Sequence, residues 1–259
     1  MDEDKVTIKV RNLRKEFGAP GGGRNIAVDN VSFDICSGEA FGLAGMSGSG
    51  KSTIGRIIMN LDKLDAGEVF FEGHLVSGAQ SQASIALRSK MQMVFQNPVA
   101  SMNPRRTARS IIEMPLKSFG IGNAAERKER AYELLELVGL SSRHAEYYPH
   151  EFSGGQCQRL GIARALATNP KFIFLDEPVS ALDVSIQAQI LNLLKDLQEK
   201  FKLTYLIVAN NLNVGGFIAD RLAILSEGRI VEIDQTNELF DAPQHKVTKE
   251  LLTSILSLK

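Results

Sequence analysis

The segment 45–53 constrains the fold of this chain more than any other part of the sequence. It reads Gly45-Met46-Ser47-Gly48-Ser49-Gly50-Lys51-Ser52-Thr53 and matches the pattern G-x-x-x-x-G-K-[ST]. Glycines let the backbone turn tightly enough to direct N–H groups at phosphates, while Lys51 adds a positive charge and Ser52 a hydroxyl for Mg²⁺. An apolar run at 40–44 precedes the segment, and Ile54, Ile57, Ile58 and Leu61 follow it with helical spacing. This order of strand, loop and helix predicts a phosphate-binding loop for a nucleoside triphosphate and argues against a flexible Gly/Ser linker.

Composition narrows the class of protein. A chain of 259 residues has room for a large α/β core with an inserted subdomain, or for two small domains. Lys plus Arg and Asp plus Glu are balanced at 30 each, so no overall basic field would attract nucleic acid. Cys36 and Cys157 form no C-x-x-C pattern, which argues against a zinc site or a disulfide framework. No run approaches about 18 apolar residues, and the start of the chain is acidic. We therefore expect a soluble, intracellular chain without a signal peptide or transmembrane segment, and no nucleic-acid partner.

A second feature is the apolar run 172–175, which is followed by Asp176 and Glu177. Four consecutive apolar residues are typical of a strand buried on both faces of a parallel sheet, and carboxylates at its carboxyl end lie on the ligand side. Asp176 is expected to belong to the Mg²⁺ shell, and Glu177 to polarise a water that attacks the γ-phosphate. Taken alone, the pair could also be an ordinary acidic strand end.

The remaining pattern predicts an α/β protein with a mostly parallel sheet and helices on both faces. Alternation at 5–12 and 27–35 indicates N-terminal strands, and the apolar spacing from 97 to 140 indicates a helical insertion. Segments 221–225 and 229–233, around Glu227 and Gly228, are expected to form a hairpin, and the tail from 236 is expected to be helical. A turn at 153–156 is expected to precede a helix over 159–167. That turn is either a common Gly turn or a second phosphate-facing helix start. Phe17, beside the glycine-rich stretch 18–23, could stack on a purine ring or fill the core at a strand end.

These motifs in this order resemble the ATP-binding subunit of ABC transporters over essentially the whole chain. The phrases VFQNPVASMNPR (94–105), YYPHEFSGGQCQRLGIARAL (147–166) and LDEPVSALDVSIQAQILNLL (175–194) are similar to the peptide/nickel import branch of that family. The resemblance implies the P-loop NTPase fold of an ABC ATPase, as a single domain over 1–259. Its expected parts are a nucleotide-binding core with an antiparallel β subdomain (5–96 and 161–235), a helical signature subdomain (97–160) and a short helical tail (236–259).

The resemblance also implies a role for each site residue. Residues Gly45, Ser47, Gly48, Ser49, Gly50, Lys51, Ser52 and Thr53 would form the Walker A loop, with Phe17 as the adenine-stacking aromatic. Gln96 would be the Q-loop residue, Asp176 the Walker B carboxylate and Glu177 the catalytic base. Ser153, Gly154, Gly155 and Gln156 would form the signature that serves the partner's nucleotide, and Asp183 would belong to the D-loop. The cofactors implied are ATP and Mg²⁺, the metal being held by Ser52, Gln96 and Asp176.

Three positions depart from the family pattern. Met46 stands where this branch usually has an acidic residue, and Cys157 where it usually has Arg. Asn210 occupies the position of the switch histidine, which belongs with Gln96 and Glu177 among the catalytic positions. Asparagine can donate a hydrogen bond but cannot take up a proton or carry charge.

The sequence therefore predicts an ATPase subunit that powers an ABC importer for peptides or nickel-like metal complexes, at the cytoplasmic face of the inner membrane. Its expected partners are a second ABC ATPase subunit, by preference an unlike one, integral membrane permeases and, indirectly, a substrate-binding protein. Two alternatives stay open. One is a subunit that binds nucleotide but hydrolyses it poorly within a heterodimer, and the other is an ABC ATPase without a permease.

Overall fold

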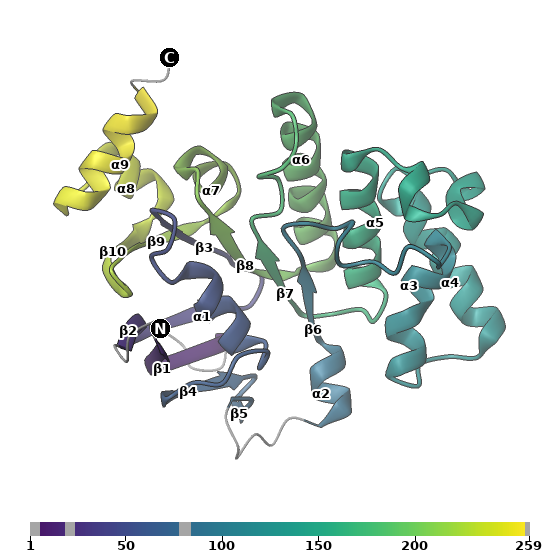
Figure 1. Cartoon of the computed structure of the whole chain (residues 1–259), viewed down its shortest axis with the longest axis horizontal. Helices are drawn as coiled ribbons and strands as arrows, with labels where there is room; N and C mark the ends of the chain where they lie inside the picture. Colours follow the sequence, from purple (N-terminus) through teal and green to yellow (C-terminus); the bar gives the residue numbers. More distant parts are fainter. Residues whose placement is uncertain (1–5, 19–23, 78–83, 257–259) are drawn as a thin grey trace. The chain divides into compact units, whose positions relative to one another are not determined.

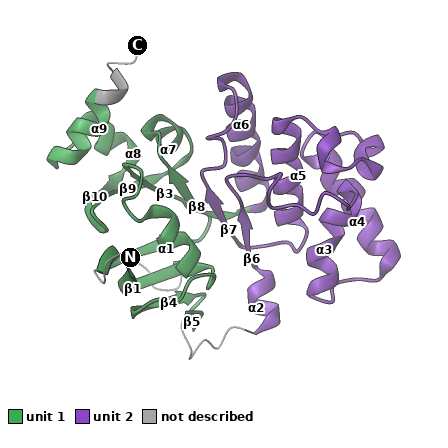
Figure 2. Cartoon of the chain, in the orientation of Figure 1, with its two compact units in different colours: residues 1–83, 202–259 green, residues 84–201 purple. Residues whose placement is uncertain are grey.

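The computed structural model describes residues 6–18, 24–77 and 84–256. It divides the chain into two compact units, one made of Met1–Ala83 with Lys202–Lys259 and the other of Ser84–Phe201 (Figures 1 and 2). The second unit is therefore an insertion in the sequence of the first. Residues 19–23 of the expected glycine-rich loop, residue 5 of the expected first strand and the end of the tail lie outside the described residues.

The first unit contains an antiparallel sheet with the strand order β2-β1-β4-β5. Its strands are β1 (Val6–Gly18), β2 (Arg24–Cys36), β4 (Ala66–Phe71) and β5 (His74–Leu75). Val10 on β1 lies opposite Phe33 on β2 and Val69 on β4, and all three side chains are buried. One apolar face of this sheet is thus turned to the core, as the alternating pattern predicted.

The same unit holds a set of mostly parallel strands. β3 (Ala40–Gly45) pairs in parallel with β8 (Thr204–Ala209) and with β9 (Arg221–Ser226), and β10 (Arg229–Gln235) runs antiparallel to β9. Every residue of β3 and β8 is buried, as expected for strands covered on both faces. Helix α1 (Lys51–Ile58) follows β3 and buries Ile54, Ile57 and Ile58. It ends before Leu61, which is 56% exposed, so the predicted apolar face is one residue shorter than the spacing indicated.

Short helices complete this unit. They are α7 (Leu212–Ile218), α8 (Thr236–Asp241) and α9 (Lys246–Leu256). Val247, Leu251 and Leu252 of α9 pack against a buried cluster that includes Leu222 and Leu239. Glu232 of β10 accepts hydrogen bonds from the backbone N–H groups of Gln244 and His245 and from the Thr248 hydroxyl at the start of α9. The tail is helical, as predicted, and this carboxylate holds its last helix to the sheet.

The second unit is mainly helical (Figure 2). Its helices are α2 (Ile85–Ser89), α3 (Ala108–Ser118), α4 (Ala124–Leu137), two short 3₁₀ turns (Ser142–Glu146 and Pro149–Glu151), α5 (Gly154–Leu166) and α6 (Val184–Phe201). Two strands, β6 (Met91–Val94) and β7 (Phe172–Asp176), pair in parallel. The expected boundaries of a signature subdomain at 97 and 160 stay a prediction, because the compact unit extends on both sides of them. Among the described residues, no helix is both long and apolar enough to cross a membrane.

The start of α5 differs from the sequence expectation. We expected a turn at 153–156 and a helix from Arg159, but the helix begins at Gly154. Ser153 caps it: its hydroxyl accepts a hydrogen bond from the Gln156 backbone N–H at 3.3 Å, and the Gln156 side chain accepts one from the Ser153 N–H at 2.9 Å. This reciprocal capping satisfies two backbone donors and outweighs the low helix propensity of two glycines.

Glu113 is a buried carboxylate in α3, with 4% of its surface exposed. It accepts hydrogen bonds from Arg109 at 3.0 Å and from Lys117 at 2.6 Å, one helical turn away on either side. Burial alone would raise the pKa of this carboxyl, but the two cations outweigh burial, so the pKa lies below its ordinary value.

We expect Glu113→Gln to lower the free energy of unfolding at neutral pH by about 2 kcal/mol, since hydrogen bonds to charged groups contribute about that much. Because the folded pKa is lowered, the stabilisation is fully present above the unfolded pKa and is lost as the pH falls through the folded one. Urea denaturation at neutral and acidic pH measures both effects. The gap between parent and variant should shrink in acid, and a gap that widened would contradict this assignment. Glu129→Gln, at an exposed position of α4, is the matched control.

Candidate functional site

The phosphate loop between β3 and α1 depends on two glycines with positive φ. Gly45 has a φ of 146° and Gly50 a φ of 102°. A Cβ at Gly45 would lie 2.3 Å from the Leu225 carbonyl oxygen, and one at Gly50 would lie 2.1 Å from the Ala27 carbonyl oxygen. Both contacts are to backbone atoms and are too short for any side chain. The loop can therefore keep this path only with glycine at these two positions.

Lys51 lies beneath the loop. Its side chain is 4% exposed, and its ammonium donates hydrogen bonds to the carbonyl oxygens of Gly45 at 2.8 Å and Met46 at 2.7 Å. Ser49 Oγ lies 3.4 Å away. Gly50 provides no side-chain cap for the first turn of α1, so the positive end of that helix faces the loop without a competing side chain. A cation and a helix N-terminus at a glycine turn together form an anion-binding arrangement.

A hairpin turn holds this loop from the side. The backbone N–H of Gly228, between β9 and β10, donates to the Ser49 carbonyl at 3.2 Å, and the Gly228 carbonyl accepts from the Asp29 N–H at 2.8 Å. The guanidinium of Arg229 donates twice to the Asp29 carboxylate, at 2.8 and 2.5 Å. The predicted hairpin around residues 227 and 228 is thus present and connects the phosphate loop with β2.

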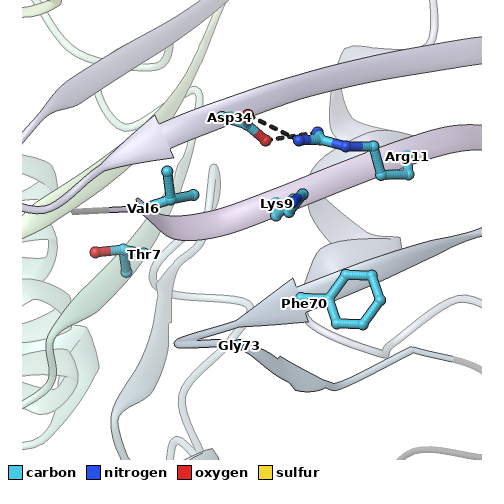
Figure 3. Close-up of a pocket in the computed structure, with 7 residues that line it drawn as sticks. All are labelled: Val6, Thr7, Lys9, Arg11, Asp34, Phe70 and Gly73. Carbon is cyan, nitrogen blue, oxygen red and sulfur yellow. Dashed lines mark hydrogen bonds and ion pairs between the residues drawn. The ribbon is translucent and has the colours of Figure 1, made fainter. Parts of the chain in front are cut away.

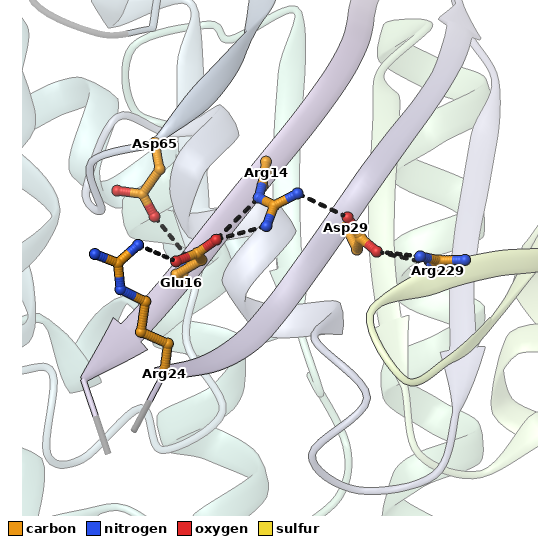
Figure 4. A network of polar contacts seen from close by, with 6 residues as sticks. All are labelled: Arg14, Glu16, Arg24, Asp29, Asp65 and Arg229. Carbon is orange, nitrogen blue, oxygen red and sulfur yellow. Dashed lines mark hydrogen bonds and ion pairs between the residues drawn. The ribbon is translucent and has the colours of Figure 1, made fainter. Parts of the chain in front are cut away.

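A chain of charged groups continues from Asp29 to the end of β1 (Figure 4). Arg14 reaches the Asp29 carboxylate at 3.5 Å and donates to the Glu16 carboxylate at 2.6 and 3.0 Å. Hydrogen bonds from Arg14 are the main cause of a lowered Glu16 pKa. Asp65 accepts the Glu16 backbone N–H at 2.6 Å, and this bond is the main cause of a lowered Asp65 pKa.

The charged chain ends beside Phe17. The Lys15 ammonium lies 3.4 Å from the Asp65 carboxylate and 5.2 Å from the centroid of the Phe17 ring. Phe17 is 42% exposed, so the reading as a core phenylalanine is wrong. The Phe17 ring is exposed, lies beside a cation and sits at the end of β1, where Asp65 bonds the strand's backbone. This ring is therefore available to stack on a planar ligand.

Asn210 lies in the same unit as the phosphate loop. Strand β8 runs parallel to β3, and Ala209 lies opposite Ala44. Asn210, the next residue after Ala209, is therefore in register with Gly45, the next residue after Ala44. Asn210 is exposed. The side-chain oxygen of its neighbour Asn211 accepts the Asn213 N–H at 2.9 Å and caps α7. The register of two strands thus places Asn210 at the edge of the sheet from which the loop leaves.

A second group of site residues lies within the second unit. The Gln96 amide, two residues after β6, donates to the Glu177 carboxylate at 2.8 Å, and Ser180 Oγ lies 3.4 Å from the same nitrogen. Glu177 follows β7 with a φ of 46°, which is unusual for a residue with a side chain. Asp176 ends β7, and both carboxylates are partly exposed. The parallel pairing of β6 and β7 explains why residues 81 positions apart meet.

The signature residues and Asp183 belong to this unit too. Ser153 and Gly154 are exposed at the start of α5, while Gly155 and Gln156 are partly exposed. A Cβ at Gly155 would lie 2.6 Å from a methyl group of Ile186, so α6 passes close to this turn. Asp183 is exposed directly before α6.

The predicted site residues thus form two groups. The first unit holds the phosphate loop, Phe17 and Asn210, and the second holds Gln96, Asp176, Glu177, the signature and Asp183. Sequence reasoning assigned no role of their own to three supporting residues: Asp29, Asp65 and Ser180. Their roles depend on hydrogen bonds across strands and turns, which no local pattern of one sequence reveals.

A separate hollow of about 470 Å³ lies on the antiparallel sheet (Figure 3). Its lining includes Lys9 and Phe70, which lie opposite each other on β1 and β4, and Arg11, whose guanidinium donates to the Asp34 carboxylate at 2.5 and 2.8 Å. None of the predicted site residues lines it.

Known proteins resemble this chain in sequence. The sequence model described as "ABC transporter" matches residues 28–180. The dipeptide transport ATP-binding protein DppF of Lactococcus lactis subsp. cremoris is 47% identical over 99% of this chain and 83% of its own length. The oligopeptide transport ATP-binding protein OppF of Bacillus subtilis is 49% identical over 96% of this chain and 82% of its own.

Solved structures agree with the sequence match. The ATP-binding cassette MJ0796, in a dimeric post-hydrolysis state bound to ADP and Pi, superposes with a TM-score of 0.79 at 35% identity. That match covers 88% of this chain and 98% of the cassette. The predicted fold is thereby confirmed. At these identities and coverages the chain belongs to the ABC transporter family, as an ATP-binding domain of that family.

Proposed function

We propose that this chain is the ATP-hydrolysing subunit of an importer for peptides, and that it works on a membrane permease from the cytoplasmic side. Members of the family couple ATP hydrolysis to transport, and their cassettes dimerise. The observation that carries the nucleotide part of the proposal is the buried Lys51 ammonium among the oxygens of a glycine-enforced loop. The choice of peptides over metal complexes rests on relatives that are named for dipeptide and oligopeptide transport.

The residues of the loop suit the phosphates of ATP. Lys51 would exchange its carbonyl contacts for phosphate oxygens, and the amides of residues 47–53 would supply further donors. Phe17 would stack on the adenine. The oxygen donors Ser52, Gln96 and Asp176 are the hard ligands that Mg²⁺ prefers, and the metal, when bound, would neutralise phosphate charge.

Glu177 is proposed as the base that orients and activates the attacking water. Its carboxylate accepts the Gln96 amide at 2.8 Å, so this amide can report to the base whether the site is loaded. Ser153–Gln156 and Asp183 would act at the nucleotide of a second cassette. A separate ATPase chain, rather than a second copy, is the partner we favour.

The first test removes the loop cation. We expect Lys51→Ala to weaken MgATP binding by about 10- to 100-fold, since a charged hydrogen-bond donor contributes about 1.5–3 kcal/mol. Calorimetry on the full chain measures the affinity, and uptake of labelled peptide by the assembled transporter should fall with it. Lys63→Ala, an exposed lysine after α1, is the control. Equal affinities for Lys51→Ala and the parent would remove the loop as the binding site. If the assembled transporter took up nickel and no peptide, the proposed substrate would be wrong.

The second test separates binding from hydrolysis. Glu177→Gln should retain ATP binding but lose water activation, with a fall in turnover of about 10²–10⁴-fold. A dimer closed on ATP should then persist with the proper partner, and size-exclusion chromatography with and without ATP detects it. Glu129→Gln on α4 should behave as the parent does. If the Glu177 variant elutes as a monomer with ATP and partner present, the proposed dimer, in which the signature of one cassette acts at the nucleotide of the other, is wrong.

Asn210 favours a second function, that of a subunit whose own nucleotide site is slow. A phosphoryl transition state is stabilised by donors fixed around its oxygens and by correct placement of water. Asparagine is shorter than histidine, neutral and differently angled. The side-chain oxygen of its neighbour Asn211 already caps α7, which fixes the orientation of that side chain. Turnover would then come mainly from the site formed by the partner's loop and this chain's signature.

This idea predicts a gain of function. In the complex, with the partner's phosphate loop disabled, Asn210→His should raise single-turnover hydrolysis by about 10²–10³-fold, the usual effect of one such donor. Asn213→His, on the exposed side of α7, should leave the rate unchanged. An unchanged rate for Asn210→His would mean that this site is not limited by the missing imidazole.

A further inference from the structure

Arg164 is a buried cation in the second unit for which the proposed mechanism has no use so far. It lies near the end of α5 and is 7% exposed. Burial lowers its pKa, which reflects the loss of water around the guanidinium. Among the described residues, no carboxylate forms an ion pair with it. A buried charge without a counter-ion is destabilising unless its hydrogen-bond donors are satisfied. The groups that satisfy the Arg164 donors therefore show which segment this side chain holds in place.

The contacts of Arg164 are with residues before and after Gln96 along the chain. One guanidinium nitrogen donates to the Ser101 carbonyl at 2.8 Å, and the other to Ser101 Oγ at 3.0 Å. The guanidinium carbon lies 5.5 Å from the centroid of the Phe95 ring, which is within the range of a cation–π contact. Phe95 directly precedes Gln96, and Ser101 follows it by five residues.

The segment after Gln96 is itself a closed turn. The Ser101 backbone N–H donates to the carbonyls of Asn97 at 3.2 Å and Pro98 at 3.1 Å, and the Ser101 hydroxyl donates to Pro98 at 2.8 Å. A Cβ on Gly161, one helical turn before Arg164, would lie 3.7 Å from Pro98, so the turn rests against α5. By binding Ser101 and Phe95, Arg164 fixes both ends of the backbone that carries the Gln96 side chain.

We infer that Arg164 is a positioning residue: it holds Gln96 opposite Glu177 and makes that placement depend on the helix that begins at the signature. This inference rests on the proposed function of Gln96 and Glu177. Gln96 Nε2 meets Glu177 at 2.8 Å only if the backbone of residues 95–101 keeps its present path. Ser153, which caps α5, and Arg164 belong to one helix, so a displacement of the signature is transmitted to this path.

A double-mutant cycle tests whether Arg164 acts through Gln96. The assay is single-turnover ATP hydrolysis by the complex, with the partner's phosphate loop disabled. Arg164→Met keeps much of the side-chain volume but removes the donors. We expect it to lower the rate by about 10- to 100-fold, as displacement of a catalytic group does, with the affinity for ATP nearly unchanged. In a Gln96→Ala background the same substitution should have little further effect.

The controls separate this role from a general effect on folding. Arg159 lies on the same helix, and its guanidinium donates to the Val138 carbonyl at 2.7 Å, which is not part of the Gln96 segment. Arg159→Met should therefore leave the rate unchanged. Arg164→Lys keeps the charge over Phe95 and one donor, so it should recover part of the rate. If Arg164→Met does not fold, Arg164→Lys takes its place in the cycle. Amide exchange should become faster at residues 96–101 in the Arg164 variant and stay unchanged at 153–156.

Two results would overturn the inference. One is an equal fall in rate when Arg164 is replaced in the parent and in the Gln96→Ala background, because independent effects multiply. The other is a fall in ATP affinity that accounts for the whole loss of activity. Either result leaves the proposed function intact. Failure of that function would instead appear as hydrolysis that Lys51→Ala and Glu177→Gln do not affect.

Discussion

The close approach of the phosphate loop to its neighbouring backbone is the contact on which the proposed nucleotide site depends. Gly50 passes so near the Ala27 carbonyl, and Gly45 so near that of Leu225, that any Cβ would overlap them. The Gly228 turn then bonds the loop at Ser49. Because these contacts join the loop to β2 and to the β9–β10 hairpin, a local glycine motif is held in place by two segments that are distant in sequence. That support keeps the buried Lys51 ammonium among loop oxygens, where an anion can take their place.

The charged chain from Arg229 to Asp65 extends this support to the end of β1. Its members from Arg229 to Glu16 alternate in sign, and the bonds of Arg14 to Glu16 and of Asp65 to the Glu16 backbone hold the strand beside Phe17. Exposed ion pairs of this kind contribute little to stability one by one. Their value here is geometric, since they restrain the exposed ring that we propose to stack on adenine. The second unit follows the same principle with Arg164, which restrains the segment around Gln96.

Much of the fold could be predicted from this one sequence. The strand, loop and helix around Lys51, the buried strand before Asp176 and the hairpin around Gly228 all carry strong local signals, since glycine patterns and apolar runs leave few alternatives. The start of α5 was placed wrongly because two glycines disfavour a helix, whereas the reciprocal bonds of Ser153 and Gln156 stabilise one. Phe17 could not be assigned as exposed or buried, because a single aromatic residue next to a loop has no periodicity to orient it.

The sequence by itself determined the family, the glycine-rich loop and the chemical type of each candidate site residue, including the asparagine at 210. These are properties of residue identity and spacing, which short segments encode. Only the tertiary structure decided which groups meet: Gln96 with Glu177, Asp29 with Arg229, and Arg164 with both sides of Gln96. Such contacts depend on strand register, on the path of turns and on the burial of a charge, and these follow from the packing of segments that lie far apart along the chain.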